Sequence, residues 1–372
     1  MKKRIILAII TLTLIAALIA VLPMLKSKAP SGEGTSADTN DRLEYWSEDS
    51  AVMKSIITYV ASATDKNSDG FVAPEDRIAV FDFDGTLYGE LFPTYFDTCL
   101  FIHRALHDKS FNAPEDIKEY AQELEDALYN YLPEPDSDKS TAQCAAELFK
   151  GMTLDEYREY VDDFMKTPAY GFENMTYGEG FYLPMVELVR YLSEHDFTVF
   201  ISSGSERTMV RRLISGTLDK WIPSYQVIGS TFSLEATGQG DKAGKSYSYS
   251  ADDEVLMEGN LVIKNQKTNK VFSIVDEIGK APVLVFGNSS GDLAMAQYAL
   301  QNGGKAYMLL CDDTARDYGD TGKAASFAED CAKLGMETIS MKDDFETIYK
   351  KDAVKAEAAD EDDAADELKP AA

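Results

Sequence analysis

Two aspartates follow a short apolar segment near residue 80 and could take part in chemistry. The segment AVFDFDGTLYGE covers residues 79–90 and places Asp82 and Asp84 two positions apart, directly before Gly85. Carboxylates can act as nucleophiles, as general acids or bases, and as oxygen ligands for a cation. An isolated pair of this kind is also typical of a solvated turn, so its meaning depends on what lies beside it.

Polar residues also end two later apolar segments. These are FTVFISSG, residues 197–204, and APVLVFGN, residues 281–288. Short β-branched runs of this kind predict buried parallel strands, and a doubly wound sheet binds ligands beyond the carboxyl ends of its strands. We therefore expect one site at this edge of the sheet, containing Asp82, Asp84, Ser203, Asn288 and Asp292.

The elements that must position this site indicate an α/β fold. An amphipathic helix, LPMVELVRYLSEHD, leads into the second strand, and strands alternate with helical patterns along the middle of the chain. We expect a doubly wound parallel sheet, with a catalytic core made of residues 46–90 and 182–350. Within that core, residues 217–265 are expected to form turns and irregular hairpins.

A helical cap domain is expected between the first two strands. Residues 91–181 carry apolar side chains at helical spacing, in segments punctuated by Pro and Gly. We interpret this stretch as an insertion that covers the predicted site.

The two ends of the chain differ from its middle. Residues 1–25 begin with three basic residues followed by an apolar run, which predicts an exported chain with a signal or transmembrane anchor. An uncleaved anchor is favoured over a cleaved signal, and both remain open. Residues 26–45 are expected to be a flexible linker, and residues 351–372 a disordered acidic tail.

The chain is strongly acidic, with 64 Asp and Glu residues, 36 Lys and Arg residues and a net charge of −28. Such a surface repels nucleic acids and anionic membranes, so neither is expected as a partner, apart from the membrane at the N-terminal anchor. The four cysteines contain no C-x-x-C pair; Cys311 and Cys331 could form a disulfide, or all four could be buried thiols.

Four motifs in order resemble the haloacid dehalogenase superfamily, specifically its phosphatases, over roughly residues 70–345. They are PEDRIAVFDFDGTL, YLPMVELVRYL, FISSGS and IGKAPVLVFGNSSGD. Within the superfamily the chain is most similar to exported bacterial phosphatases, and more distantly to phosphorylcholine and phosphoserine phosphatases.

The resemblance implies a role for each matching residue. Asp82 would be the nucleophile that forms an aspartyl-phosphate, and Asp84 the general acid and then base. Ser203, with Gly204, would bind a phosphate oxygen at the start of a helix. Arg211 matches an arginine of the close relatives that binds phosphate, although a structural ion pair is an equal alternative.

A lysine and a metal complete the implied site. Lys270 is the best match to the lysine of the superfamily, and Lys264 and Lys267 are alternatives. Asn288 stands at a position that is usually acidic, but its amide oxygen can still bind Mg²⁺ together with Asp82 and the backbone carbonyl of Asp84. Asp292 would support the metal or the lysine.

Two further groups of residues could bind metals. DKNSDGFVAPED, residues 65–76, matches the first half of a calcium loop; the ligands would be Asp65, Asn67, Asp69 and Asp76, but an Asp-rich turn explains the pattern as well. Cys99, His103 and His107 lie four residues apart on an expected cap helix. That spacing fits Zn²⁺, although an amphipathic helix needs no metal.

Together these patterns predict a Mg²⁺-dependent phosphomonoesterase that acts on small phosphate esters outside the cytoplasm. The alternative is a catalytically degraded, Ca²⁺-stabilised surface binding module on the same fold. The identity of the substrate and the oligomeric state do not follow from the sequence.

Overall fold

The computed structural model describes residues 43–356 of the 372-residue chain. The predicted anchor (1–25), most of the predicted linker and residues 357–372 of the predicted tail lie outside the described residues. Within residues 43–356, no helix is both long and apolar enough to cross a membrane.

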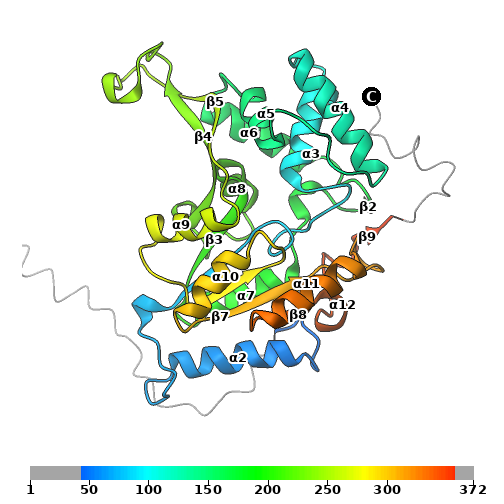
Figure 1. Cartoon of the computed structure of the whole chain (residues 1–372), viewed down its shortest axis with the longest axis vertical. Coiled ribbons are helices and arrows are strands. Elements are labelled where there is room, and N and C mark those ends of the chain that lie inside the picture. Colours follow the sequence, from blue (N-terminus) through cyan, green and yellow to red (C-terminus); the bar gives the residue numbers. More distant parts are fainter. Residues whose placement is uncertain (1–42, 357–372) are drawn as a thin grey trace, which may run out of the picture. The chain divides into compact units, whose positions relative to one another are not determined.

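Seven strands form the central sheet, in the order β5-β4-β3-β1-β6-β7-β8 (Figure 1). All neighbours are parallel except β4 and β5, which confirms the predicted doubly wound α/β fold. Strand β1 lies between β3 and β6, so the three strands predicted to carry the site are adjacent. The strands are β1 (Ile78–Phe81), β3 (Thr198–Glu206), β4 (Val227–Ala236), β5 (Val255–Ile263), β6 (Leu284–Gly287), β7 (Lys305–Leu310) and β8 (Glu337–Ser340).

Helices cover both faces of the sheet because alternate residues of β1 point to opposite sides. Ala79 and Phe81 pack in one apolar core with α2 and α7, whereas Ile78 and Val80 pack in another with α9, α10 and α11. The bounds are α2 (Ala51–Thr64), α7 (Leu183–Glu194), α8 (Arg207–Leu213), α9 (Thr268–Glu277), α10 (Leu293–Gln301), α11 (Thr321–Lys333) and α12 (Met341–Asp344).

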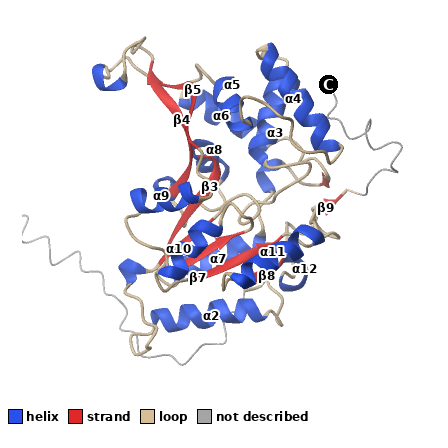
Figure 2. Ribbon diagram, viewed as in Figure 1, coloured by secondary structure: helices blue, strands red, loops and turns tan. Residues whose placement is uncertain are grey.

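The helices expected between β1 and β3 are present (Figure 2). Helix α6 packs into the main core, whereas α3, α4 and α5 pack around a core of their own. That core contains Phe101, Ile117, Leu124 and Leu148. A π-helical turn continues α3, and Ser140 and Thr153 cap α5 and α6 in reciprocal capping boxes. The elements are α3 (Phe96–Ile102), η3 (His103–His107), α4 (Glu115–Tyr129), α5 (Thr141–Leu148) and α6 (Leu154–Met165).

The stretch expected to form turns and irregular hairpins contains turns and one long hairpin, whose strand pairing shifts register at two places. Its first strand, β4, starts parallel to β3 and then pairs antiparallel with β5. The hairpin reaches the cap, where the backbone N–H of Gly151 donates to Met257 and the N–H of Met257 donates to Met152 (Figure 1). Gly and Ser within β4 and exposed side chains on β5 hide the strand pattern in the sequence.

Both predicted terminal segments extend into the folded part. Leu43 is buried, and the backbone N–H groups of Glu44 and Tyr45 donate to the Glu187 carboxylate, so the linker predicted to reach residue 45 ends earlier. Near the other end, β9 (Val354–Lys355) pairs with β2 (Phe172–Glu173), so residues 351–356 are not a disordered tail. Short 3₁₀ turns cover Pro74–Asp76, Tyr177–Glu179, Ser224–Gln226 and Gly244–Ser246.

Residues 65–76, the predicted calcium loop, form an Asp-rich turn after α2. Oδ1 of Asp65 accepts hydrogen bonds from Asn67, while Asp76 forms an ion pair with Lys280 at 2.6 Å. Within residues 43–356 no three His, Cys, Asp or Glu side chains converge on a metal position. Because a calcium loop also uses Asn and backbone oxygens, calcium binding at this turn stays a prediction.

The geometry argues against the zinc hypothesis for Cys99, His103 and His107. Nε2 of His107 lies 2.7 Å from Oε1 of Glu125, and no metal-binding group of three is found in the described part of the chain.

Candidate active site

The turn after β1 carries the two aspartates that the sequence singled out. The backbone N–H of Asp82 donates to Phe286 of β6, which ties the start of the turn to the neighbouring strand. Gly85 has a φ of 77°, and a Cβ there would lie 1.9 Å from Nδ2 of Asn288. Only glycine therefore permits the chain to turn while Asn288 packs directly against it.

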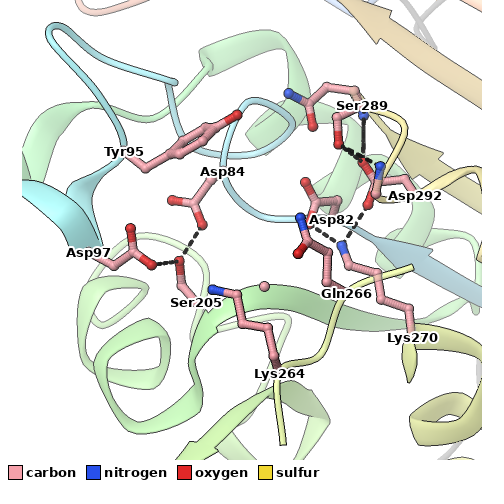
Figure 3. A pocket seen from close by; sticks show the side chains of 13 residues that line it. Asp82, Asp84, Tyr95, Asp97, Ser205, Lys264, Gln266, Lys270, Ser289 and Asp292 are labelled. Carbon is pink, nitrogen blue, oxygen red and sulfur yellow. Dashed lines mark hydrogen bonds and ion pairs between the residues drawn. The ribbon is translucent and has the colours of Figure 1, made fainter. Parts of the chain in front are cut away.

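Lys270 joins two of the predicted carboxylates. Its ammonium forms ion pairs with Asp82 and, at 2.6 Å, with Asp292, and all three side chains are buried (Figure 3). Burial alone would lower the pKa of Lys270, but the charges of Asp292 and Asp82 outweigh burial and raise it. The lysine therefore stays positive beside Asp82. This resolves the choice among three lysines in favour of Lys270.

Asp292 holds the loop that follows β6. Its Oδ2 accepts hydrogen bonds from the backbone N–H groups of Asn288 and Ser289, each at 3.1 Å, while its Oδ1 accepts from Lys270. Both carboxylate oxygens are thus occupied by protein donors. Asp292 therefore positions the lysine and the loop.

Asp84 has a different environment from Asp82. Oδ2 of Asp84 accepts a hydrogen bond of 2.7 Å from Ser205, whereas its Oδ1 is buried without a protein partner in the described residues. Burial raises the pKa of Asp84, and the charge of Asp97 raises it further. Burial also raises the pKa of Asp82, as does Asp292, but Lys270 opposes this effect. The pKa of each aspartate is therefore raised, and a directly paired ammonium opposes this shift at Asp82.

Ser203 does not occupy the position expected of it. Its hydroxyl is fully buried, accepts from the backbone N–H of Ser205 and lies 3.5 Å from Asp84. Because β3 continues to residue 206, Ser203 lies in a strand and not at the start of a helix. Gly204 and Ser205 line the cavity instead.

Arg211 does not reach the cavity. Its guanidinium donates to the backbone carbonyls of Ser224 at 2.8 Å and Val227 at 3.2 Å, and so fixes the segment that leads into β4. The prediction that Arg211 binds phosphate is wrong, because α8 points this side chain toward β4.

The site residues surround a cavity of about 100 Å³. Sequence reasoning missed Tyr95, Asp97, Ser205 and Gln266 as lining residues, and treated Lys264 only as an alternative to Lys270. Figure 3 shows Ser205 between Asp84 and Asp97, with Lys264 beside it. The only available signal was the last serine of SSGS, one strand repeat after Ser203.

The oxygen atoms near Asp82 fit a hard cation such as Mg²⁺. The cavity is lined by four aspartates and two lysines, so it has an excess of negative charge that opposes an anionic ligand unless a cation is bound. Glu90 accepts a hydrogen bond of 2.8 Å from Nδ2 of Asn288, which fixes the orientation of that amide. Asn288 packs against the turn at Gly85 through Nδ2, and its Oδ1 lies 3.5 Å from the Thr86 hydroxyl. The amide oxygen of Asn288, Asp82 and the backbone carbonyl of Asp84 would be the oxygen donors.

A family model described as haloacid dehalogenase-like hydrolase matches residues 79–297, which is more than half of the chain. The chain belongs to this family. The matched range runs from β1 to α10 and includes Asp82, Asp84, Lys270 and Asp292. The haloacid dehalogenase-like core is thus the part of the chain that carries the cavity.

Solved structures resemble this hydrolase only distantly. A conserved protein of unknown function from Anaerococcus prevotii has a TM-score of 0.47 at 15% identity, covering 80% of this chain and 92% of its own. Cytosolic 5'-nucleotidase IIIB bound to cytidine has a TM-score of 0.44 at 14% identity, covering 78% and 86%. A putative phosphatase from Clostridium difficile has a TM-score of 0.36 at 15% identity, covering 71% and 93%. No curated protein sequence gives a significant match.

Proposed function

We propose that this hydrolase is a Mg²⁺-dependent phosphomonoesterase that cleaves small phosphate esters through an aspartyl-phosphate. The observation that supports it best is the ion pair of Asp82 with Lys270 opposite Asp84, which accepts hydrogen bonds from the Ser203 and Ser205 hydroxyls and forms no ion pair within residues 43–356. A charged nucleophile and a separate proton donor are the two groups that phosphate transfer to a carboxylate requires.

The first half of the reaction transfers the phosphoryl group to the enzyme. An oxygen of Asp82 forms a bond to phosphorus as the bond between phosphorus and the ester oxygen breaks. Asp84 gives its proton to the departing oxygen, which leaves as an alcohol. Lys270 lowers the repulsion between the carboxylate and the phosphate, since its positive charge lies beside Asp82.

The second half returns the enzyme to its starting state. Asp84, now ionised, takes a proton from water as the water oxygen attacks phosphorus, and the bond between phosphorus and Asp82 breaks to release inorganic phosphate. Ser205 holds Asp84 in place for both proton transfers.

Mg²⁺ at the donors named above would neutralise charge on the transferring phosphoryl group. The chain offers only one carboxylate there, because Asn288 replaces an acidic residue. Binding should therefore be weaker than at a site with two carboxylate ligands.

The small cavity supports a substrate with a small alcohol group. In residues 1–25 basic residues precede an apolar run, and this pattern supports action outside the cytoplasm. Purified protein should release phosphate from small monoesters with Mg²⁺, and EDTA should stop the reaction. Asp82→Asn should lose nearly all turnover while keeping its circular dichroism spectrum and melting temperature. Asp155→Asn, at an exposed position on α6, is the matched control. If Asp82→Asn turned over substrate as fast as the wild type, the mechanism would be refuted.

A further inference from the structure

A second cavity is lined by cap residues and by Ala356 at the end of the described chain, and it is much larger than the active-site cavity. Its volume is about 580 Å³, within the usual range for small-molecule sites. It is bordered by α3 with its π-helical turn, by α4, and by the segment from the end of α6 to Phe172. Its principal side chains are His103, His107, Glu125, Tyr129, Phe164 and Tyr177.

This cap cavity is separate from the active site. The two cavities share no lining residue. The ring of Phe96, which is fully buried, lies between them: its centroid is 5.3 Å from that of Phe164 and 6.0 Å from that of Tyr177 on the cap side, and 5.9 Å from that of Tyr88 toward the Asp84 turn. A small molecule in the cap cavity would therefore contact neither Asp82 nor Asp84.

Polar side chains line this cavity, among them His103 and Glu125. The ring nitrogens of His103 form no hydrogen bond with any protein group in residues 43–356, although the ring packs against Phe164 and Tyr160. Burial, followed by the charge of His107, lowers the pKa of His103, so the ring is neutral and can both donate and accept. The Glu125 side chain is 9% exposed and bonds His107 at 2.7 Å. π-Helical turns such as His103–His107 are frequent at functional sites.

The lining selects against anions. The residues that line the cap cavity within 43–356 include no Lys or Arg, while Glu125 supplies a carboxylate. The aromatic side chains of Tyr129, Phe164, Tyr170 and Tyr177 provide flat apolar walls, which attract both aromatic rings and cations.

We propose that the cap cavity is a binding site for a small aromatic amine, with its ring among the aromatic side chains and its amino group toward Glu125 and His103. The site is distinct from the phosphate site and does not depend on phosphatase activity. Because α3 contributes Asp97 to the active-site cavity and Cys99 to the cap cavity, one short helix borders both sites.

Titration calorimetry on the full-length protein tests this site with two indoles of similar shape and opposite charge. Tryptamine should bind at one saturable site, and indole-3-acetate at least about tenfold more weakly, which is roughly 1.4 kcal/mol. Glu125→Gln should weaken tryptamine binding by a similar factor. Glu119→Gln, at an exposed position on the same helix, is the matched control and should bind like the wild type.

A second variant guards against loss of folding. Thr167 is half-buried on the cavity wall, so Thr167→Trp should fill the space and abolish binding while its melting temperature shows a folded protein. Asp82→Asn should bind tryptamine normally, and inorganic phosphate should not compete. Absence of saturable tryptamine binding, equal binding of the two indoles, or competition by phosphate would each overturn the proposal.

Discussion

The hydroxyl of Ser205 lies 2.7 Å from Oδ2 of Asp84 and donates a hydrogen bond to it. The same hydroxyl lies 3.1 Å from Oδ2 of Asp97, which comes from the cap. A serine hydroxyl has one proton and cannot donate fully to two carboxylates. The arrangement is therefore best satisfied when one of the two acids carries a proton of its own. A residue of the cap thus takes part in the environment of the proposed acid.

Removing this shared hydroxyl should impair the proton transfers. Hydrogen bonds to charged groups contribute about 1.5–3 kcal/mol, so Ser205→Ala should lower kcat/KM for alkyl phosphates by roughly 10- to 150-fold. Ser193→Ala removes a buried hydroxyl on α7 that has no partner among residues 43–356 and should leave kcat/KM unchanged. Full activity in Ser205→Ala would show that Asp84 is held by other contacts.

Lys270 should also be essential for stability, because it neutralises two buried carboxylates. Breaking a buried pair by removing one partner typically destabilises by about 3–5 kcal/mol, so Lys270→Met should lower the free energy of unfolding by about that amount at pH 8. Burial already raises the pKa of Asp82, and losing the ammonium raises it further. The folded variant then binds protons more tightly than the unfolded chain, so its deficit should shrink as the pH falls.

Urea unfolding at pH 8 and pH 5.5 measures this deficit. Lys270→Met combined with Asp292→Asn should recover part of the lost stability, since it removes one of the unpaired charges. A deficit that is the same at both pH values, and is unaffected by Asp292→Asn, would mean that lost packing and not charge is responsible.

The core of the site could be predicted because its signals are local. Asp82 and Asn288 each follow an apolar strand within a few residues, and a parallel sheet brings such strand ends together whatever lies between them in the sequence. Lys270 was identified among three candidates because it opens the helix before β6. None of these inferences required knowledge of the cap.

Other predictions failed where the direction of a side chain depends on packing. Ser203 and Ser205 differ by one strand repeat, and only the continuation of β3 to residue 206 shows that Ser205 lines the cavity. The residues around Arg211 do not indicate whether its side chain points to the site or to β4, and packing decides for β4. Asp97 comes from the cap, and no local pattern indicates which of its many acidic residues faces the core.

Asp317 should make stability depend on pH in a region away from the proposed chemistry. Burial raises its pKa to about 6, although the backbone N–H of Tyr318 and the hydroxyl of Tyr349 oppose the shift. Its unfolded pKa is about 3.9. The folded state thus retains this proton more strongly, so the contribution of Asp317 falls as pH rises from about 4 to about 6 and then stays constant.

Asp317→Asn isolates that contribution. The pKa of Asp317 differs by about 2 units between the folded and unfolded states, and each unit corresponds to about 1.36 kcal/mol. Relative to this variant, the wild type should therefore lose roughly 3 kcal/mol of unfolding free energy between pH 4 and pH 7. Urea unfolding of both proteins across this interval measures the difference. Parallel curves would show that the carboxyl of Asp317 ionises as easily in the folded protein as in the unfolded chain.

The last prediction tests whether Asp84 supplies the proton for the leaving group. A proton donor increases the rate most when the leaving oxygen is strongly basic. An alkoxide from an alkyl phosphate needs one, whereas p-nitrophenolate leaves almost unaided. General acid catalysis typically contributes ~10²–10⁴-fold, so Asp84→Asn should lose most of that factor with alkyl phosphates and much less with p-nitrophenyl phosphate.

The comparison must use kcat/KM, because this ratio reports formation of the aspartyl-phosphate, the step in which the alcohol departs. Asp84 also serves the later attack by water, and that role would lower kcat equally for both substrates. Asp97→Asn provides a further contrast, because it keeps the carboxyl of Asp84 but removes the neighbouring charge. The loss of kcat/KM in this variant should also be larger with alkyl phosphates than with p-nitrophenyl phosphate. If Asp84→Asn lowers kcat/KM equally for the two esters, then Asp84 positions the turn or the metal, and the proton comes from another group.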